Sequence, residues 1–152
     1  MRRLLLFLLP LLCTPVAKLH AAGLFDFAGS WAGWYDCRQG RTALELDVSV
    51  TGPESLQALF YFHAVSSNPR VPAGCFLMAG KVDPVNAALA LHPTAWLLRP
   101  VGFVPVGLHG MLNQNQLQGF ISGPGCSDFL LTRQPAPAAP APCTPPQGLF
   151  QS

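Results

Sequence analysis

Thr42-Ala43-Leu44-Glu45-Leu46-Asp47-Val48-Ser49-Val50 is the most regular segment of the chain. Its apolar and polar side chains alternate, and this period of two is typical of a strand with one buried face. Residues 51–55, Thr-Gly-Pro-Glu-Ser, are typical of a turn, and the alternation resumes in Leu-Gln-Ala-Leu-Phe-Tyr-Phe-His-Ala at 56–64. The two segments therefore predict a β-hairpin.

Further short segments of the same kind follow along the chain, bounded by Gly, Pro, Asn or Asp, and none has helical periodicity. They are residues 31–37, 75–82, 87–92, 95–99, 104–112, 117–122 and 127–133. The turns between neighbours are short, which favours pairing of each strand with the next one along the chain. The sequence therefore predicts an all-β fold, an antiparallel up-and-down eight-stranded barrel, with a β-sandwich as the alternative.

The first 23 residues have the order of a secretory signal peptide. Arg2 and Arg3 precede an apolar run at 4–12, and small residues follow at 21–23. The run is far shorter than the roughly 20 residues that span a bilayer. We therefore expect a secreted or periplasmic protein with a signal peptide at 1–23, a barrel domain at 24–133 and a Pro/Ala-rich tail at 134–152.

Composition excludes several classes of partner. The chain has 152 residues and is 50% hydrophobic and only 11% charged. Subtracting Arg2, Arg3 and Lys18 of the signal peptide leaves 6 basic against 7 acidic residues, a net charge of −1. We expect no basic face for nucleic acid or anionic lipid from this balance. The uncharged stretch 100–126 is interrupted by Gly, Asn and Gln, so no membrane span is expected in the mature chain.

Removal of Cys13 with the signal peptide leaves four cysteines: Cys37, Cys75, Cys126 and Cys143. No two of them are two to four residues apart, as zinc ligands usually are, so disulfides are expected rather than a metal site. Of the three possible connectivities the barrel favours one, because its first and last strands are antiparallel neighbours. Cys37, at the end of the first strand, then lies beside Cys126, at the start of the last. Cys75 is left to pair with Cys143.

Two residues at opposite ends of the predicted barrel carry a resemblance to known proteins. Gly29-Ser30-Trp31 opens the first predicted strand, and Arg133 closes the last. With this Gly-x-Trp and late arginine, the chain resembles the calycins, the lipocalin and avidin group. The resemblance implies a calycin-like barrel whose floor is closed by the Arg133 guanidinium stacked on the Trp31 indole. It implies no biotin binding, because no set of residues matches the biotin contacts of avidin.

A second resemblance covers nearly the whole domain. Three motifs carry it: Trp-x-Gly-x-Tyr-x-Cys-x-Gln-Gly at 31–40, Trp-Leu-Leu-Arg-Pro at 96–100 and Gly-Pro-Gly-Cys at 123–126. In these motifs the chain is similar to small secreted bacterial domains of unassigned activity. This resemblance implies a small exported domain and no particular chemistry.

Groups suited to catalysis are few. After the signal peptide the chain has only His63, His92 and His109, each expected on an outer face or at a strand end, where a histidine is usually solvated. There is no nucleophile elbow, zinc-protease motif or phosphate loop. Glu45 and Asp47 point outward on one strand, where adjacent acids mostly serve solubility. We therefore expect no enzyme, no catalytic residue, no metal and no cofactor.

Aromatic side chains are the more promising candidates for binding. Five are expected to point into the barrel as cavity candidates: Trp31, Tyr35, Phe60, Phe62 and Phe76. A barrel of this size holds its own side chains or one small ligand. Large side chains on short strands favour a filled core over a cavity.

Four further residues are binding candidates on the rim: Trp34, Arg70, Trp96 and Arg99. Trp and Arg dominate binding hot spots, and Trp34 faces away from the predicted interior. Arg70 lies in the longest internal loop, residues 65–74, which two prolines stiffen.

These features predict a non-catalytic exported β-barrel that binds through its rim loops or a small apolar cavity. The alternative is an inhibitor or immunity protein that blocks a secreted or periplasmic enzyme with residues 68–73. The partner is then a small apolar ligand or an extracytoplasmic protein. A small hydrolase is the least favoured class.

Overall fold

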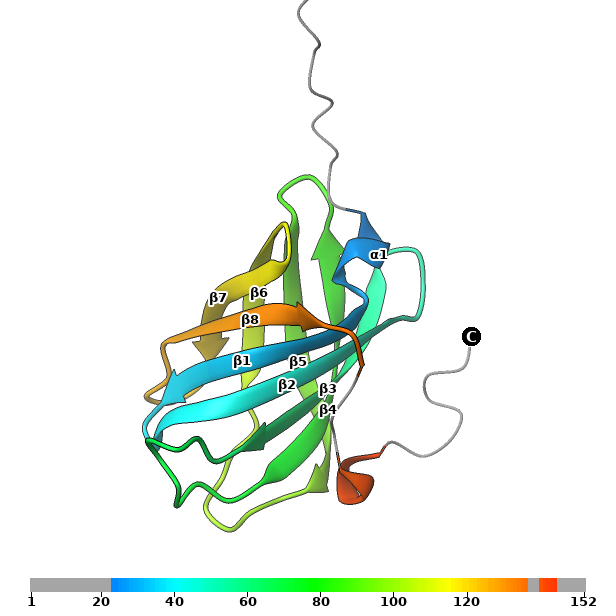
Figure 1. The fold of residues 1–152 in the computed structure, drawn as a ribbon. Helices are drawn as coiled ribbons and strands as arrows, with labels where there is room; N and C mark the ends of the chain where they lie inside the picture. The colour runs from blue at the N-terminus through cyan, green and yellow to red at the C-terminus, as the bar shows by residue number, and fades with distance from the viewer. Residues whose placement is uncertain (1–22, 137–139, 145–152) are drawn as a thin grey trace, which may run out of the picture.

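The structure, a computed structural model, describes residues 23–136 and 140–144, which form a closed barrel of eight antiparallel strands (Figure 1). Each strand pairs with the next along the chain, and the last pairs with the first. The predicted all-β, up-and-down barrel is confirmed, and the alternative β-sandwich is excluded. Residues 1–22 of the predicted signal peptide and part of the predicted tail lie outside the described residues.

The strands are β1 Gly29–Cys37, β2 Gly40–Val50, β3 Ser55–His63, β4 Gly74–Asp83, β5 Ala88–Leu98, β6 Gly107–Asn113, β7 Gln116–Ser122 and β8 Asp128–Gln134. A short helix, α1 (Leu24–Phe27), precedes β1, and a single 3-10 turn, η1 (Ala141–Cys143), follows β8. The β1–β2, β3–β4, β5–β6 and β7–β8 loops lie at one end of the barrel, called the mouth. The other three loops and α1 lie at the opposite, closed end (Figure 1).

The predicted hairpin is confirmed, because β2 pairs with β3 along almost its whole length. The prediction of two strands at 87–92 and 95–99 is wrong, because β5 runs through Pro93 as one strand. Beyond Leu91, β5 pairs with β4 alone, and the register between them shifts at two places, one of them between Leu77 and Met78. These irregularities accommodate the proline, which has no N–H to donate to a neighbouring strand.

The closed end is sealed by α1 and by two side chains from neighbouring strands. Trp31 of β1 lies opposite Arg133 of β8, and the Arg133 guanidinium lies 4.2 Å from the centre of the Trp31 ring. The Trp31 indole N–H donates a 2.9 Å hydrogen bond to the Phe27 carbonyl. Arg133 donates to the carbonyl of Ala28 at 2.7 Å and to that of Asp26. The stacking that the calycin resemblance implies is therefore present, on a short helix that the sequence pattern does not predict.

The interior is densely packed, and the strands bend around it. The largest fully buried side chains are Trp31, Phe27, Phe60, Phe62, Phe76 and Phe129. At Gly80 of β4 and Gly119 of β7 the neighbouring strand passes so close that a Cβ would overlap a backbone carbonyl. Glycine at such positions lets a strand coil tightly enough to close a barrel.

Two disulfides, Cys37–Cys126 and Cys75–Cys143, confirm the predicted pairing. The first joins the end of β1 to the β7–β8 loop at the mouth. The second holds η1 against β4 and β5, where Cys75 and Cys143 are buried beside Leu59. The end of the described chain is therefore fastened to the outer face of the barrel, as Figure 1 shows for η1.

Replacing Arg133 by Gln should lower the free energy of unfolding by about 2 kcal/mol, because a cation–π contact and two charge-assisted hydrogen bonds are lost. Urea unfolding measures the change. Arg70→Gln is the control, because Arg70, exposed like Arg133, makes none of these contacts within the described residues, and it should change stability by less than about 0.5 kcal/mol. Equal stabilities of the two variants would contradict the sealing role of Arg133.

Removing the Cys37–Cys126 bridge by the double substitution Cys37→Ala and Cys126→Ala should destabilise the protein by about 4 to 5 kcal/mol in the chain-entropy account. The reason is that the bridge closes a loop across a sequence separation of 89 residues. Unfolding under non-reducing conditions measures the loss. Peptide mapping without reductant checks the pairing itself, and a Cys37–Cys75 fragment would refute both the pairing and the strand order.

Candidate functional site

A pocket of about 500 Å³ opens at the mouth of the barrel. This volume lies within the range of about 300 to 1,000 Å³ that is usual for small-molecule sites. Most of the lining side chains are apolar: Tyr35, Phe60, Phe62, Phe76, Phe103, Val104 and Val106. The β1–β2 turn adds Arg38 and Gln39, beside the Cys37–Cys126 disulfide.

The register of β1, β3 and β4 builds the aromatic wall of this mouth pocket. Phe60 and Phe76 are direct cross-strand partners, and their rings stack with centroids 4.6 Å apart. The Tyr35 ring meets Phe60 edge-on at 5.4 Å, and Phe103 stacks on Phe62 at 5.3 Å. Edge-on and stacked pairs are the preferred aromatic geometries, so these rings hold one another in place.

The polar groups of the pocket come from Tyr35 and the β1–β2 turn. The Gln39 side-chain amide donates to the Tyr35 hydroxyl at 3.2 Å and to the Thr42 hydroxyl at 3.3 Å. Burial raises the pKa of the Tyr35 hydroxyl, although its hydrogen bonds to Thr42 and Gln39 act in the opposite direction. The phenol therefore stays neutral, and it is suited to hydrogen bonding with a ligand rather than to acting as a base.

The β3–β4 loop is fastened to the β1–β2 turn, which fixes this side of the rim. The Asn68 side-chain amide donates to the carbonyl of Gln39 at 2.7 Å and to that of Arg41 at 3.1 Å. The Asn68 backbone N–H donates to the Val65 carbonyl at 2.9 Å. The loop is thus held at its base, and Arg70 is exposed beyond it.

Residues 99–106, the β5–β6 loop, cover another side of the mouth and are called the lid. The Phe103 N–H donates to the Pro100 carbonyl at 3.2 Å, and Arg99 donates to the Phe103 carbonyl at 3.3 Å. The predicted strand at 104–112 is therefore wrong at its start, since β6 begins at Gly107. Pro105 and the internal bonds of the lid keep these residues out of the sheet.

The four predicted rim residues do not form one surface. Trp96 is half-buried and meets the Phe76 ring edge-on at 4.9 Å, so it supports the wall instead of standing exposed as expected. Trp34 lies on the outer face of β1, away from the pocket. Arg99, an exposed residue of the lid, has its guanidinium 5.9 Å from the centre of the Trp96 ring, so these two predicted rim residues lie together, while Arg70 is exposed on the separate β3–β4 loop.

Four of the five predicted cavity residues, Tyr35, Phe60, Phe62 and Phe76, line the mouth pocket. Trp31 does not line it, because it lies at the closed end as part of the floor. The four lining side chains are only 0 to 3% exposed, so the interior beneath the pocket is filled, as expected, and the pocket opens above them at the rim. Strands β6, β7 and β8 have 7 residues each, against 9 to 11 in the other five. They therefore supply fewer side chains to fill the mouth.

Sequence reasoning missed the pocket side chains that come from the β1–β2 turn and the lid, namely Arg38, Gln39, Phe103, Val104 and Val106. Phe103 had a signal that could have found it, since it is a lone aromatic side chain in a segment bounded by Pro100 and Pro105. An aromatic ring in such a loop usually packs against the domain beneath it.

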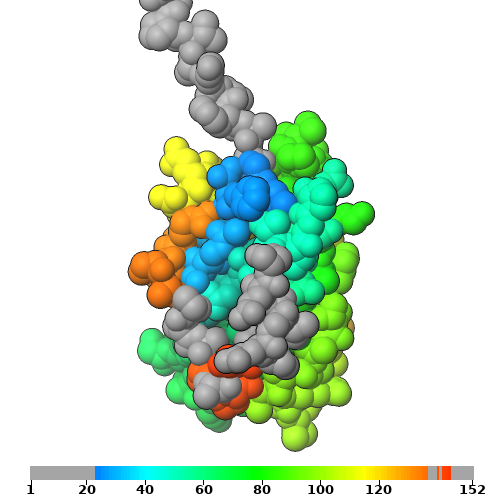
Figure 2. Space-filling model, turned by 90° about the vertical axis from the view of Figure 1, so that its right-hand side faces the viewer, coloured from blue at the N-terminus to red at the C-terminus, as the bar shows by residue number. Residues whose placement is uncertain are grey.

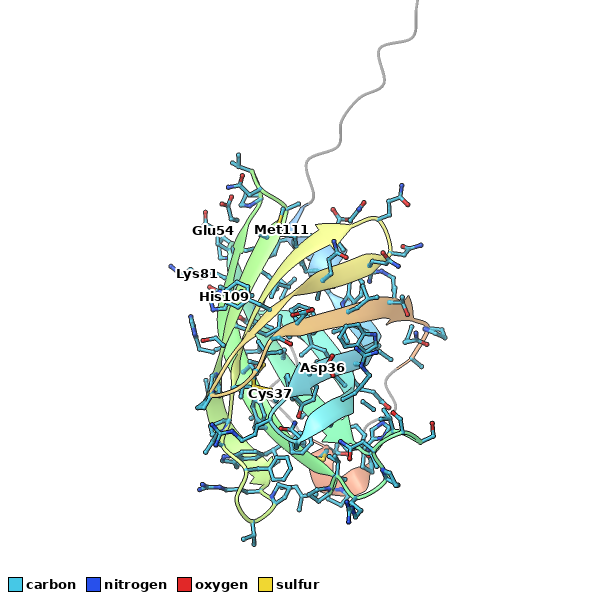
Figure 3. All side chains as sticks on the ribbon, turned by 90° about the vertical axis from the view of Figure 1, so that its left-hand side faces the viewer. Asp36, Cys37, Glu54, Lys81, His109 and Met111 are labelled. Carbon is cyan, nitrogen blue, oxygen red and sulfur yellow. A yellow bond between two sulfur atoms is a disulfide. The ribbon has the colours of Figure 1, made fainter. Side chains whose placement is uncertain are left out.

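A second hollow of about 830 Å³, called the flank groove, lies on the outer face of β4–β8 beside Trp34. Met111 and Phe120 are 58% and 55% exposed there, and His109 stacks on Phe120 with centroids 4.7 Å apart. Figure 3 shows Lys81, His109 and Met111 together on this flank. Apolar residues at both inward and outward positions of β6 and β7 are the signal that sequence reasoning overlooked.

The remaining titratable groups considered from the sequence lie outside the mouth pocket. His63 Nε2 lies 3.2 Å from Glu45 Oε1, and His63 Nδ1 lies 3.0 Å from the Ala64 carbonyl oxygen. His63 lies on the outer face of β3 as expected, with its side chain 36% exposed, and these two contacts also fix its ring. Burial raises the pKa of the Asp47 carboxyl. A hydrogen bond with Ser30 opposes this rise, and the nearby charge of Glu45 adds to it.

Comparison with other proteins leaves the site to be interpreted from its own geometry. No model of a known protein family matches the chain, and no curated protein matches it. Within residues 23–136 and 140–144, no helix is long and apolar enough to cross a membrane.

Val106→Phe tests whether the mouth pocket is open space. Val106 is only 7% exposed, but a phenyl ring there can enter the pocket, so the unfolding free energy should change by less than about 1 kcal/mol. Val48, 4% exposed, faces the filled interior, and Val48→Phe should destabilise by about 1 to 3 kcal/mol. Urea unfolding compares the two, and equal losses would mean that the mouth is as tightly packed as the core.

Proposed function

We propose that the protein is an exported, non-catalytic β-barrel that binds a small apolar molecule in the mouth pocket. The observation that carries the proposal is the hollow of about 500 Å³ at the mouth, bordered mainly by apolar residues and lying over a buried aromatic cluster. Small-molecule sites are typically concave, mainly apolar, and supplied with a few placed polar groups. Here those groups are the Tyr35 hydroxyl and the Gln39 amide.

The chemistry of the pocket supports binding rather than turnover. A neutral phenol, an amide and a guanidinium can orient a ligand through hydrogen bonds. Nucleophilic or acid–base catalysis instead needs a nucleophile and a base within hydrogen-bond reach of each other. The preformed rim also favours binding, because little conformational entropy is lost when a ligand enters.

The covalent structure supports export. Two disulfides indicate an oxidising environment outside the cytoplasm. The signal-peptide pattern of residues 1–23 agrees with this. We further propose a calycin-like relationship, supported by the strand topology and the Arg133–Trp31 stack.

A second candidate function is inhibition of an extracytoplasmic enzyme by residues 68–73. One observation favours it: the loop is held at its base by the Asn68 hydrogen bonds, while Arg70, Pro72 and Ala73 are exposed. A stiff exposed loop binds a partner with little loss of entropy. This partner would be a protein, so the two functions are separable by experiment.

N-phenyl-1-naphthylamine, a neutral apolar dye, tests the mouth pocket directly. We expect saturable binding with enhanced dye fluorescence, and Val106→Phe should weaken it at least about tenfold by filling the pocket, a loss of about 1.4 kcal/mol. Met111→Gln, in the flank groove, is the control and should leave binding unchanged.

Dye binding that survives Val106→Phe but is lost in Met111→Gln would place the ligand in the flank groove and refute the proposal. Absence of saturable binding would also refute it. Co-purification of one stoichiometric enzyme, released by substitution of Arg70, would instead support the inhibitor function.

A further inference from the structure

The charges of the protein are separated between the two ends of the barrel. Four of the six described basic residues lie in or beside the mouth loops: Arg38, Arg41, Arg70 and Arg99. Only two of the seven described acidic residues, Asp36 and Asp128, lie at this end. The mouth therefore carries a net charge of +2 and the rest of the described chain −3. The expectation of no basic face was drawn from the net charge of the whole chain, which does not report this separation between the two ends.

One of the four mouth arginines, Arg41, interacts electrostatically with both acids at this end. Arg41 forms a 2.8 Å ion pair with Asp36, and both Asp36 and Asp128 raise the pKa of Arg41. In the described part of the chain, Arg38, Arg70 and Arg99 form no ion pair. Three positive charges at the mouth end are therefore left without an ion-pair partner among the described residues.

The tip of the lid adds an exposed apolar group at the same end of the barrel. Val101 is fully exposed, at 101%, and Val104 is 53% exposed. The neighbouring Gly102 has no atom within 4 Å of the position of a Cβ, so the tip stands clear of the barrel. Figures 1 and 2 show this loop, in yellow-green, as the lowest part of the molecule at the mouth end. The Arg99 hydrogen bond and the stacking of Phe103 on Phe62 hold the lid in the position that leaves its valines exposed.

We propose that the mouth end docks on an anionic lipid bilayer. The lid tip enters the headgroup layer, where its valines leave water, and the three unpaired arginines contact the anionic headgroups. A basic side chain near an anionic membrane surface strengthens binding by about fivefold, and buried apolar side chains add to this. A soluble anionic partner would use the arginines but would leave Val101 in water. Docking in this orientation turns the pocket toward the membrane, although it does not depend on the proposed ligand.

Co-sedimentation of the mature full chain with lipid vesicles tests the proposal. Vesicles with about a third phosphatidylglycerol should bind the protein, and pure phosphatidylcholine vesicles should bind it much more weakly. Raising the salt from about 0.1 M to about 1 M should weaken binding, because the Debye length falls from about 10 to about 3 Å.

The chain offers matched control variants at the closed end. Val101→Asp should weaken vesicle binding by at least about fivefold. Val85→Asp should not, although Val85 is 88% exposed. Arg70→Gln should weaken binding by about fivefold, while Lys81→Gln, with the same change of net charge, should not. Arg70→Gln and Lys81→Gln both replace exposed side chains. This pair therefore still tests the proposal if the Val101→Asp variant misfolds.

Equal binding to both vesicle types, or no binding to either, would overturn the proposal. Equal effects of the mouth and closed-end variants would also overturn it, since binding would then depend on net charge alone. Val106→Phe separates this proposal from ligand binding: it should weaken dye binding at least about tenfold and leave vesicle binding unchanged. Vesicle binding can therefore fail while the pocket still binds the dye, and the reverse is equally distinguishable.

Discussion

The pairing of β1 with both β2 and β8 is the constraint on which the rest of the structure depends. It closes the sheet into a barrel, so that neither β1 nor β8 is left as a free edge strand. The same register places Trp31 opposite Arg133 at the closed end and Trp34 opposite Leu130 on the outer face. It also brings Cys37, at the end of β1, to the loop that carries Cys126. The floor, the flank groove and one disulfide are thus consequences of one strand pairing.

The two ends of the barrel are stabilised by different means. The closed end is held by packing, with α1 beneath the buried Trp31 and Arg133 across it. The mouth has fewer side chains to fill it, because three of its strands are short. The mouth is instead stabilised by one disulfide, Cys37–Cys126, and by side-chain hydrogen bonds. Asn68 donates to the Gln39 carbonyl, and Arg99 donates to the Phe103 carbonyl within the lid. An open pocket can therefore persist on a rigid rim.

This division also separates the chemical character of the two ends. The arginines lie in mouth loops, whereas most acids lie on β2 or at the closed end. A net charge near zero thus conceals a molecule with one basic and one acidic end. Because the pocket and the exposed lid tip share the basic end, ligand entry and surface docking would occur at the same face. The flank groove lies on the other side of the sheet from the barrel interior and is independent of both.

Much of the fold followed from the sequence alone because it depends on local pattern. Alternation at 42–50 and 56–64 assigned inward and outward faces, and turn residues marked the hairpins. Sequential pairing then placed Cys37 beside Cys126 without any further information. Four pocket residues were found in the same way, because the alternation along a strand shows which side chains point inward.

What only the tertiary structure decided is how far along the barrel axis each inward residue lies. The alternation along β1 assigned Trp31 and Tyr35 to the same face, but Trp31 closes the floor of the barrel and Tyr35 lines the pocket. The continuity of β5 through Pro93, the inward packing of Phe103 and the gathering of arginines at the mouth were equally hidden. The physical reason is that period-two patterning reports only the side of a strand. Strand ends, register shifts and the contacts of loops are set by residues distant in the sequence, and these decide which inward positions are packed and which are left open.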